Sequence, residues 1–259
     1  MNKPGEAFTR LLNIMDELRE KCPWDREQTT ESLRNLTIEE TYELVDAITE
    51  GDMMGVKKEL GDILLHIVFY SKIASETNIF DITDVINQLC EKLIYRHPHV
   101  FGDTQVKDAN DVIKSWEQIK ITEKDGNKTV LSGVPKSLSS LIKANRIQEK
   151  VRAVGFDWEQ RSQVWDKVNE EMNELKIEID NQNQDRIEAE FGDLLFSVVN
   201  AARLYNIDPE TALERTNRKF MKRFGFLESK TIKQGRSLKT MTLDEMNEIW
   251  DQAKEFDKQ

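Results

Sequence analysis

The sequence predicts an all-α protein built from two tandem repeats of one helical bundle unit. Apolar residues recur at helical spacing along most of the chain. Helix breakers are sparse, with 5 prolines and 11 glycines in 259 residues, and no segment shows the sustained alternation of a β-strand. A carboxylate-rich pattern also occurs twice in the same order, which is the mark of an internal repeat.

The repeat is defined by two pairs of matching segments. Glu39–Glu43 recurs as Glu170–Glu174, and Glu59–Asp62 recurs as Glu190–Asp193. Both pairs share one offset of 131 residues, and weaker similarities on either side keep the same order. Chance similarity between amphipathic helices would not preserve this order, so we infer a tandem duplication.

The boundary between the two units follows from composition. The stretch 123–135 is polar and contains Gly126, Gly133 and Pro135, which is typical of a linker. We therefore expect an N-terminal helical domain at 1–122 and a C-terminal helical domain at 136–259.

About five helices are expected in each unit, and their ends are marked by local chemistry. In the first unit, Gly51 suits a helix C-terminal cap, Asp81 suits an N-cap, and Pro98 marks a helix end. The expected first-unit helices cover about residues 8–18, 30–50, 54–77, 82–97 and 109–122. In the second unit, Asp208 precedes a proline at a first helical position, and Thr242 with Glu245 forms a capping box.

The repeated motif places four carboxylates on two neighbouring helices. In the second unit, Glu171 and Glu174 share one helix face, and Glu190 and Asp193 share a face of the next helix. The intervening turn is short, so the helices should pack antiparallel and bring the four groups together. The same set occurs in the first unit as Glu40, Glu43, Glu59 and Asp62.

Four converging carboxylates predict a divalent metal site. Like charges raise each other's pKa unless a cation compensates them, and oxygen-only ligands favour Mg²⁺, with Mn²⁺ as an alternative. A single Glu-x-x-Glu pair is usually a solvated helix face, but the whole set occurs twice. A di-iron bundle would need Glu-x-x-His on two helices, and none of the three histidines follows a glutamate by three residues.

Charge and hydropathy exclude several function classes. The net charge of −11 argues against binding a nucleic-acid polymer through a basic surface. No apolar run approaches the roughly 20 residues that span a bilayer, so no membrane partner is expected. Cys22 and Cys90 are far apart and form no Cys-x-x-Cys motif, so we expect reduced thiols and a cytoplasmic location.

On these motifs, the chain resembles the MazG family of all-α nucleotide pyrophosphohydrolases. Cys22–Asp25, Tyr95–Phe101 and the tandem arrangement are similar to full-length bacterial members. The resemblance implies hydrolysis of a nucleoside triphosphate to the monophosphate and pyrophosphate, with Mg²⁺ and broad base tolerance. It also implies a homodimer through packed helices, to which Ile63, Leu65 and Val68 would contribute.

The resemblance also assigns residue roles in the second unit. The metal ligands would be Glu171, Glu174, Glu190 and Asp193. Contacts to the substrate would come from Lys167, Arg186, Asp193, Lys219, Arg223 and Trp250. Glu170 would orient or deprotonate the attacking water. Without the resemblance, Lys219 and Arg223 could equally form a solvated helix face, and Trp250 could be a core residue.

The second unit is predicted to be the main catalytic domain, and the first is predicted to be weak or silent. Both units carry the four carboxylates, but Leu36 and Gly55 stand in the first unit where Lys167 and Arg186 stand in the second. The first unit therefore lacks two cations that could contact phosphates.

Two rival hypotheses remain open from the sequence. The protein could be a non-catalytic helical scaffold that binds a nucleotide or a partner protein as a regulator. It could also be an enzyme with a narrower substrate, as in the related dUTP and phosphoribosyl-ATP pyrophosphohydrolases. The sequence does not identify the physiological nucleotide.

Overall fold

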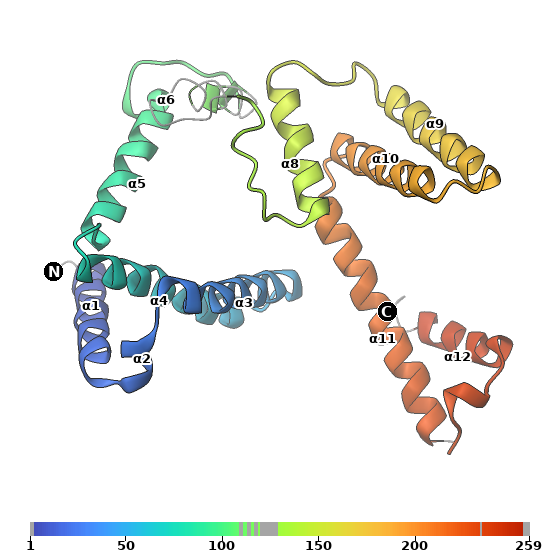
Figure 1. Cartoon of the computed structure of the whole chain (residues 1–259), viewed down its shortest axis with the longest axis horizontal. Coiled ribbons are helices and arrows are strands. Elements are labelled where there is room, and N and C mark those ends of the chain that lie inside the picture. The colour runs from blue at the N-terminus through green and yellow to red at the C-terminus, as the bar shows by residue number, and fades with distance from the viewer. Residues whose placement is uncertain are drawn as a thin grey trace. The chain divides into compact units, whose positions relative to one another are not determined.

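The computed structural model describes residues 3–108, 111–112, 115–116, 119, 129–233 and 235–255. These residues form helices and turns with no strand among them, which confirms the all-α prediction. The chain divides into two compact units, residues 1–107 and 108–259 (Figure 1). The helix expected over 109–122 and the first part of the linker expected at 123–135 lie largely outside the described residues.

The first unit is organised around a helical hairpin. Its helices are α1 (Lys3–Lys21), α2 (Pro23–Glu27), α3 (Thr30–Glu50), α4 (Met53–Glu76), α5 (Ile82–Arg96) and α6 (Pro98–Phe101). Helices α3 and α4 pack side by side, and α1 packs against α4 (Figure 1). Gly51 ends α3 with a φ of 73°, a left-handed conformation that glycine adopts without steric cost, as the sequence predicts.

Buried side chains from three helices form the core of the first unit. Met15 of α1, Leu33 of α3, and Val68 and Phe69 of α4 are each no more than 2% exposed. Val68 was expected at a subunit contact, but it lies in this core, and Leu65 packs against the same core.

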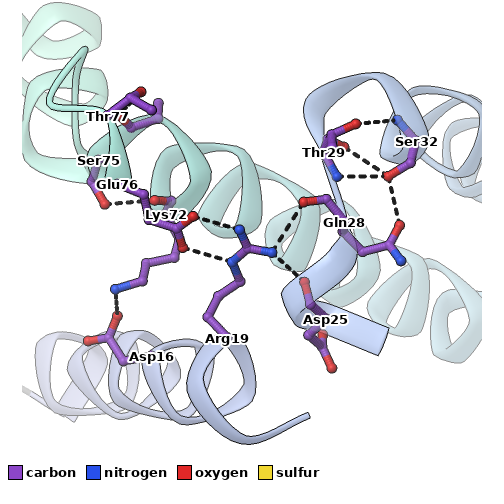
Figure 2. A network of polar contacts seen from close by, with 11 residues as sticks. Asp16, Arg19, Asp25, Gln28, Thr29, Ser32, Lys72, Ser75, Glu76 and Thr77 are labelled. Atoms are coloured by element: carbon purple, nitrogen blue, oxygen red, sulfur yellow. Dashed lines mark hydrogen bonds and ion pairs between the residues drawn. The ribbon is translucent and has the colours of Figure 1, made fainter. Parts of the chain in front are cut away.

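A polar network fixes α1 to the end of α4 (Figure 2). Arg19 donates hydrogen bonds to both carboxylate oxygens of Glu76, at 2.8 and 2.6 Å. It also donates to the backbone carbonyls of Asp25 and Gln28, which fixes the connection between α2 and α3. Beside it, the Lys72 ammonium lies 2.6 Å from Asp16.

The second unit repeats the hairpin and adds three further α-helices among its described residues. Its helices are α8 (Ser140–Ala153), α9 (Arg161–Asp180), α10 (Gln184–Leu204), α11 (Pro209–Lys233) and α12 (Leu243–Glu255), with a 3₁₀ turn at Leu238–Thr240. Helices α9 and α10 form the hairpin, α8 packs on α10, and α12 packs on α11.

The helix ends of the second unit follow the predicted capping chemistry. The carboxylate of Asp208 accepts a hydrogen bond from the backbone amide of Thr211 at 2.7 Å, at the start of α11. Thr242 and Glu245 exchange hydrogen bonds in both directions, which confirms the capping box before α12. These contacts satisfy amides that a helix N-terminus otherwise leaves unpaired.

Each hairpin leaves an apolar stripe exposed. In the first unit, the stripe consists of Leu60, Leu64 and Ile67 on α4, which are 54%, 38% and 43% exposed. In the second unit, it consists of Phe191, Leu195 and Val198 on α10, which are 49%, 59% and 45% exposed. The members of the two sets are related by the repeat offset of 131 residues. In the part of the chain that is described, no helix is long and apolar enough to cross a membrane.

Candidate active site

Three of the four predicted carboxylates of the second unit come together across the hairpin. Glu171 and Glu174 project from α9 and Glu190 from α10, and one oxygen from each lies within 4.8 Å of the others. Glu171 is 5% exposed. Asp193, one turn after Glu190 on α10, lies outside this group but close enough to act on Glu190 electrostatically.

The environment of Glu190 disfavours an uncompensated negative charge on its carboxylate. Burial raises the pKa of the Glu190 carboxyl, and the charges of Glu174, Asp193 and Glu171 raise it further. Its Oε2 atom is buried and has no hydrogen-bond partner in the described structure. An unpaired buried carboxylate oxygen is costly, and a hard cation bound by oxygen ligands would satisfy it.

Lys167 pairs with one member of this group. Its ammonium lies 2.6 Å from Glu171 and 2.9 Å from Glu170. Hydrogen bonds to these two carboxylates raise the pKa of Lys167, so it stays protonated. Glu170 is therefore paired with Lys167 and is not a member of the three-carboxylate group. Arg186 contacts Glu178 at 3.2 Å, beside this group and not within it.

Two of the other predicted substrate contacts, Arg223 of α11 and Trp250 of α12, lie against each other. The guanidinium of Arg223 lies 5.8 Å from the centre of the Trp250 ring. The rings of Phe220 and Trp250 have centroids 5.0 Å apart. Neither Lys219, Arg223 nor Trp250 lines the cavity beside the carboxylates of α9 and α10.

The first unit repeats the carboxylate group but adds a cation that the sequence comparison missed. Oxygens of Glu40, Glu43 and Glu59 lie within 4.8 Å of one another. The ammonium of Lys58 lies 3.0 Å from Glu59, 3.7 Å from Glu43 and 3.8 Å from Asp62. Burial raises the pKa of Glu40, and Asp62 adds to this shift.

The first unit lacks counterparts of Lys167 and Arg186, but Lys58 places a cation beside its carboxylates. Lys58 comes from α4 at a position where the second unit has Ala189. Lys58 matches neither Lys167 nor Arg186 at the repeat offset, so a comparison of those positions alone does not reveal it. A search for any lysine or arginine one turn from the motif would have found it.

A cavity of about 500 Å³ adjoins the carboxylates of the second unit, between α8, α9 and α10. Lys167, Glu171 and Asp193 form one part of its wall. Other parts of the wall are formed by Gln148, Asn200 and Arg203. These three residues belong to no sequence motif, so the sequence alone does not indicate them. Burial raises the pKa of Asp157, but the hydrogen bonds from Arg203 and from the Trp158 backbone, together with the charges of Arg203 and Arg152, lower it overall.

The geometry of the hairpins agrees with the comparison to known proteins. A family model described as the MazG nucleotide pyrophosphohydrolase domain matches residues 28–101 and 160–224, which include both carboxylate groups. The Thermotoga maritima protein named nucleoside triphosphate pyrophosphohydrolase/pyrophosphatase MazG is 45% identical over 257 residues, 98% of each chain.

Two further relatives support the same assignment. The nucleoside triphosphate pyrophosphohydrolase of Escherichia coli K12 is 40% identical over 95% of this chain and 96% of its own. The Bacillus subtilis protein YabN, whose name gives no function, is 44% identical over 97% of this chain and 52% of its own length. With two matched segments and relatives aligned over nearly its full length, the chain belongs to the MazG nucleotide pyrophosphohydrolase family.

Proposed function

We propose that this protein hydrolyses nucleoside triphosphates to nucleoside monophosphates and pyrophosphate, with broad base tolerance, in the cytoplasm. The observation that carries the proposal is the group of Glu171, Glu174 and Glu190, with the unpaired buried Oε2 of Glu190. The names of the Thermotoga and Escherichia relatives support the same reaction.

The residues present fit a divalent cation, and we propose Mg²⁺, with Mn²⁺ as a substitute. Glu171, Glu174, Glu190 and Asp193 would hold it. When bound, such a cation neutralises phosphate charge and makes water a better nucleophile. Lys167 stays protonated and lies at the edge of the group, so it would contact a phosphate oxygen.

The second unit is proposed as the main catalytic domain. Lys58 of the first unit lies within 4 Å of Glu43, Glu59 and Asp62 and would compete with a metal ion for these carboxylates. In the second unit, Lys167 contacts Glu171, and no contact is described between it and Glu174 or Glu190. A cation has better access to the second group than to the first.

We propose a homodimer that buries the apolar stripe. The stripe is present on α4 and on α10 at equivalent positions, and both sets are largely exposed in the single chain. A second copy of the chain offers the same surface, which is the self-complementary arrangement of a two-fold interface.

The reaction is tested by incubating the intact chain with ATP and Mg²⁺ and separating the products by ion-exchange chromatography. AMP and pyrophosphate are expected, and excess chelator should stop their formation. Formation of ADP and phosphate, or turnover that continues in chelator, would contradict the proposal. ATP binding without any product would instead support a regulatory scaffold.

A further inference from the structure

The cavity of the second unit has the size and position of a binding site for part of the substrate. Its volume of about 500 Å³ falls within the roughly 300–1,000 Å³ range of small-molecule sites. It shares Lys167, Glu171 and Asp193 with the metal and phosphate site. A nucleotide whose phosphates reach the carboxylate-held cation would therefore have this cavity beside its nucleoside part.

One wall of the cavity carries a buried hydrogen-bond acceptor with no partner. Gln148 of α8 is 4% exposed, and its Nε2 donates to the backbone carbonyl of Phe196 at 2.8 Å. Because a carbonyl can only accept, this contact fixes the orientation of the amide. The Oε1 atom is buried and has no hydrogen-bond partner among the described residues, which is costly unless a ligand supplies an N–H group.

Another wall carries an oriented donor. The Oδ1 atom of Asn200 accepts hydrogen bonds from Arg203 at 3.1 and 2.8 Å. Arg203 is 8% exposed and is itself held by Asp157. The Nδ2 group of Asn200 therefore points away from Arg203, and no partner for it is described.

The two groups are close along α10. Asn200 follows Phe196 by four residues, so the backbone carbonyl that holds Gln148 lies next to the Asn200 backbone amide in the helix. Two aromatic side chains, Phe156 and Trp158, also line the cavity and offer surface for a planar ring.

We propose that this cavity binds the nucleoside, and that the Gln148 acceptor and the Asn200 donor recognise the edge of its base. The inference rests on the proposed function and specifies which residues contact the substrate. Each common base presents an N–H donor next to an acceptor on its pairing edge, so one acceptor and one donor serve them all. This gives a physical reason for broad base tolerance.

The first unit has filled the corresponding space with its own side chains. Phe69 stands at the position of Asn200, is 2% exposed, and packs in the core with Met15 and Val68. Lys72 stands at the position of Arg203 and pairs with Asp16 (Figure 2). The nucleoside site therefore belongs to the second unit, independently of how each unit binds metal.

The test compares two ligands of the intact chain by calorimetric titration with Mg²⁺. One is adenosine 5′-(α,β-methylene)triphosphate, which cannot be cut at the proposed bond, and the other is inorganic tripolyphosphate, which has no base. Gln148→Leu and Asn200→Phe should each lower the affinity for the nucleotide analogue by roughly tenfold and leave the affinity for tripolyphosphate unchanged. Gln88→Leu, an exposed glutamine of α5, is the matched control and should change neither.

A third variant should change the preference between bases while nearly conserving the size of the side chain. Asn200→Asp keeps an oxygen for Arg203 but replaces the donor with an acceptor. Guanine presents two adjacent N–H donors, so affinity for the guanosine analogue should rise relative to the adenosine analogue. This variant also decides the matter if Asn200→Phe fails to fold, which a thermal melt would reveal.

The outcomes separate this inference from the proposed function. Unchanged nucleotide affinity in Gln148→Leu, or an equal loss for tripolyphosphate, would overturn the nucleoside site. An unchanged base preference in Asn200→Asp would overturn the role of Asn200. A wild-type chain that binds the nucleotide through these residues but releases no pyrophosphate would refute the catalytic proposal alone.

Discussion

At the residue scale, the clustered carboxylates of each hairpin repel one another, and a different lysine lies beside them in each unit. Each hairpin keeps one buried carboxylate oxygen without a described hydrogen-bond partner, on Glu59 in the first unit and on its counterpart Glu190 in the second. In the second unit, Lys167 contacts Glu171. In the first unit, Lys58 lies near Glu43, Glu59 and Asp62 at once. An internal ammonium reduces the repulsion that a metal ion would otherwise relieve, so the first group has less to gain from a cation.

A matched pair of substitutions tests which unit carries catalysis. Glu174→Gln removes one member of the second group and should lower hydrolysis by at least about a hundredfold, because several kcal/mol of charge stabilisation depend on the bound cation. Glu43→Gln makes the same change in the first unit and should leave most activity. Equal losses, or a larger loss in Glu43→Gln, would refute the assignment, with circular dichroism as the folding control.

Lys58 should suppress metal binding by the first unit. In a Glu174→Gln background, Lys58→Met should raise the affinity of the remaining site for Mn²⁺ by roughly tenfold, since it removes a positive charge within 4 Å of the carboxylates. The neighbouring Lys57→Met serves as the control and should have a smaller effect. An unchanged affinity in calorimetry or electron paramagnetic resonance would show that Lys58 does not compete with the metal.

At the element scale, the sequence predicts what local chemistry determines. Gly51, Asp81 and Thr242 end or begin helices because of backbone conformations and hydrogen bonds that depend on a few neighbouring residues. Both carboxylate groups follow from residue spacing on two helices joined by a short turn. The cavity could not be predicted in this way, because Gln148 and Asn200 come from helices that meet only through tertiary packing.

The contact between α1 and α4 should make the first unit sensitive to acid. The hydrogen bonds from Arg19 lower the pKa of Glu76 in the folded state. Its stabilising effect is therefore present above the ordinary pKa of a glutamate and is lost as the pH falls through the lowered value. Glu76→Gln should lower the thermal midpoint by about 2 °C at pH 7, and the difference should shrink as the pH falls below the ordinary pKa of a glutamate.

A second glutamine substitution provides the comparison. Glu17 pairs with Lys21 on the exposed surface of α1, where both side chains are well solvated. Glu17→Gln should change the midpoint little at pH 7 or at pH 3. A difference between wild type and Glu76→Gln that stays constant from pH 7 to pH 3 would show that the Arg19 contact does not account for the effect.

At the scale of the whole molecule, the duplication has preserved one feature and changed another. The carboxylate group and the exposed stripe are kept in both units. The space beside the carboxylates has diverged, since Phe69 is a core residue and Asn200 lines a cavity. This pattern is expected if both hairpins still serve assembly but only one still binds a nucleoside.

The stripe should hold two chains together. Light scattering at micromolar concentration should give a dimer for the wild type, and Leu64→Glu with Leu195→Glu should weaken association by roughly a hundredfold or more, because charges would be buried at the contact. Both leucines are exposed in the single chain, so each change should leave the fold of its own unit intact. Ile79→Glu alters an exposed isoleucine outside the stripe and should leave the dimer unchanged. A wild-type monomer, or a double variant that still dimerises, would show that another surface joins the chains or that none does.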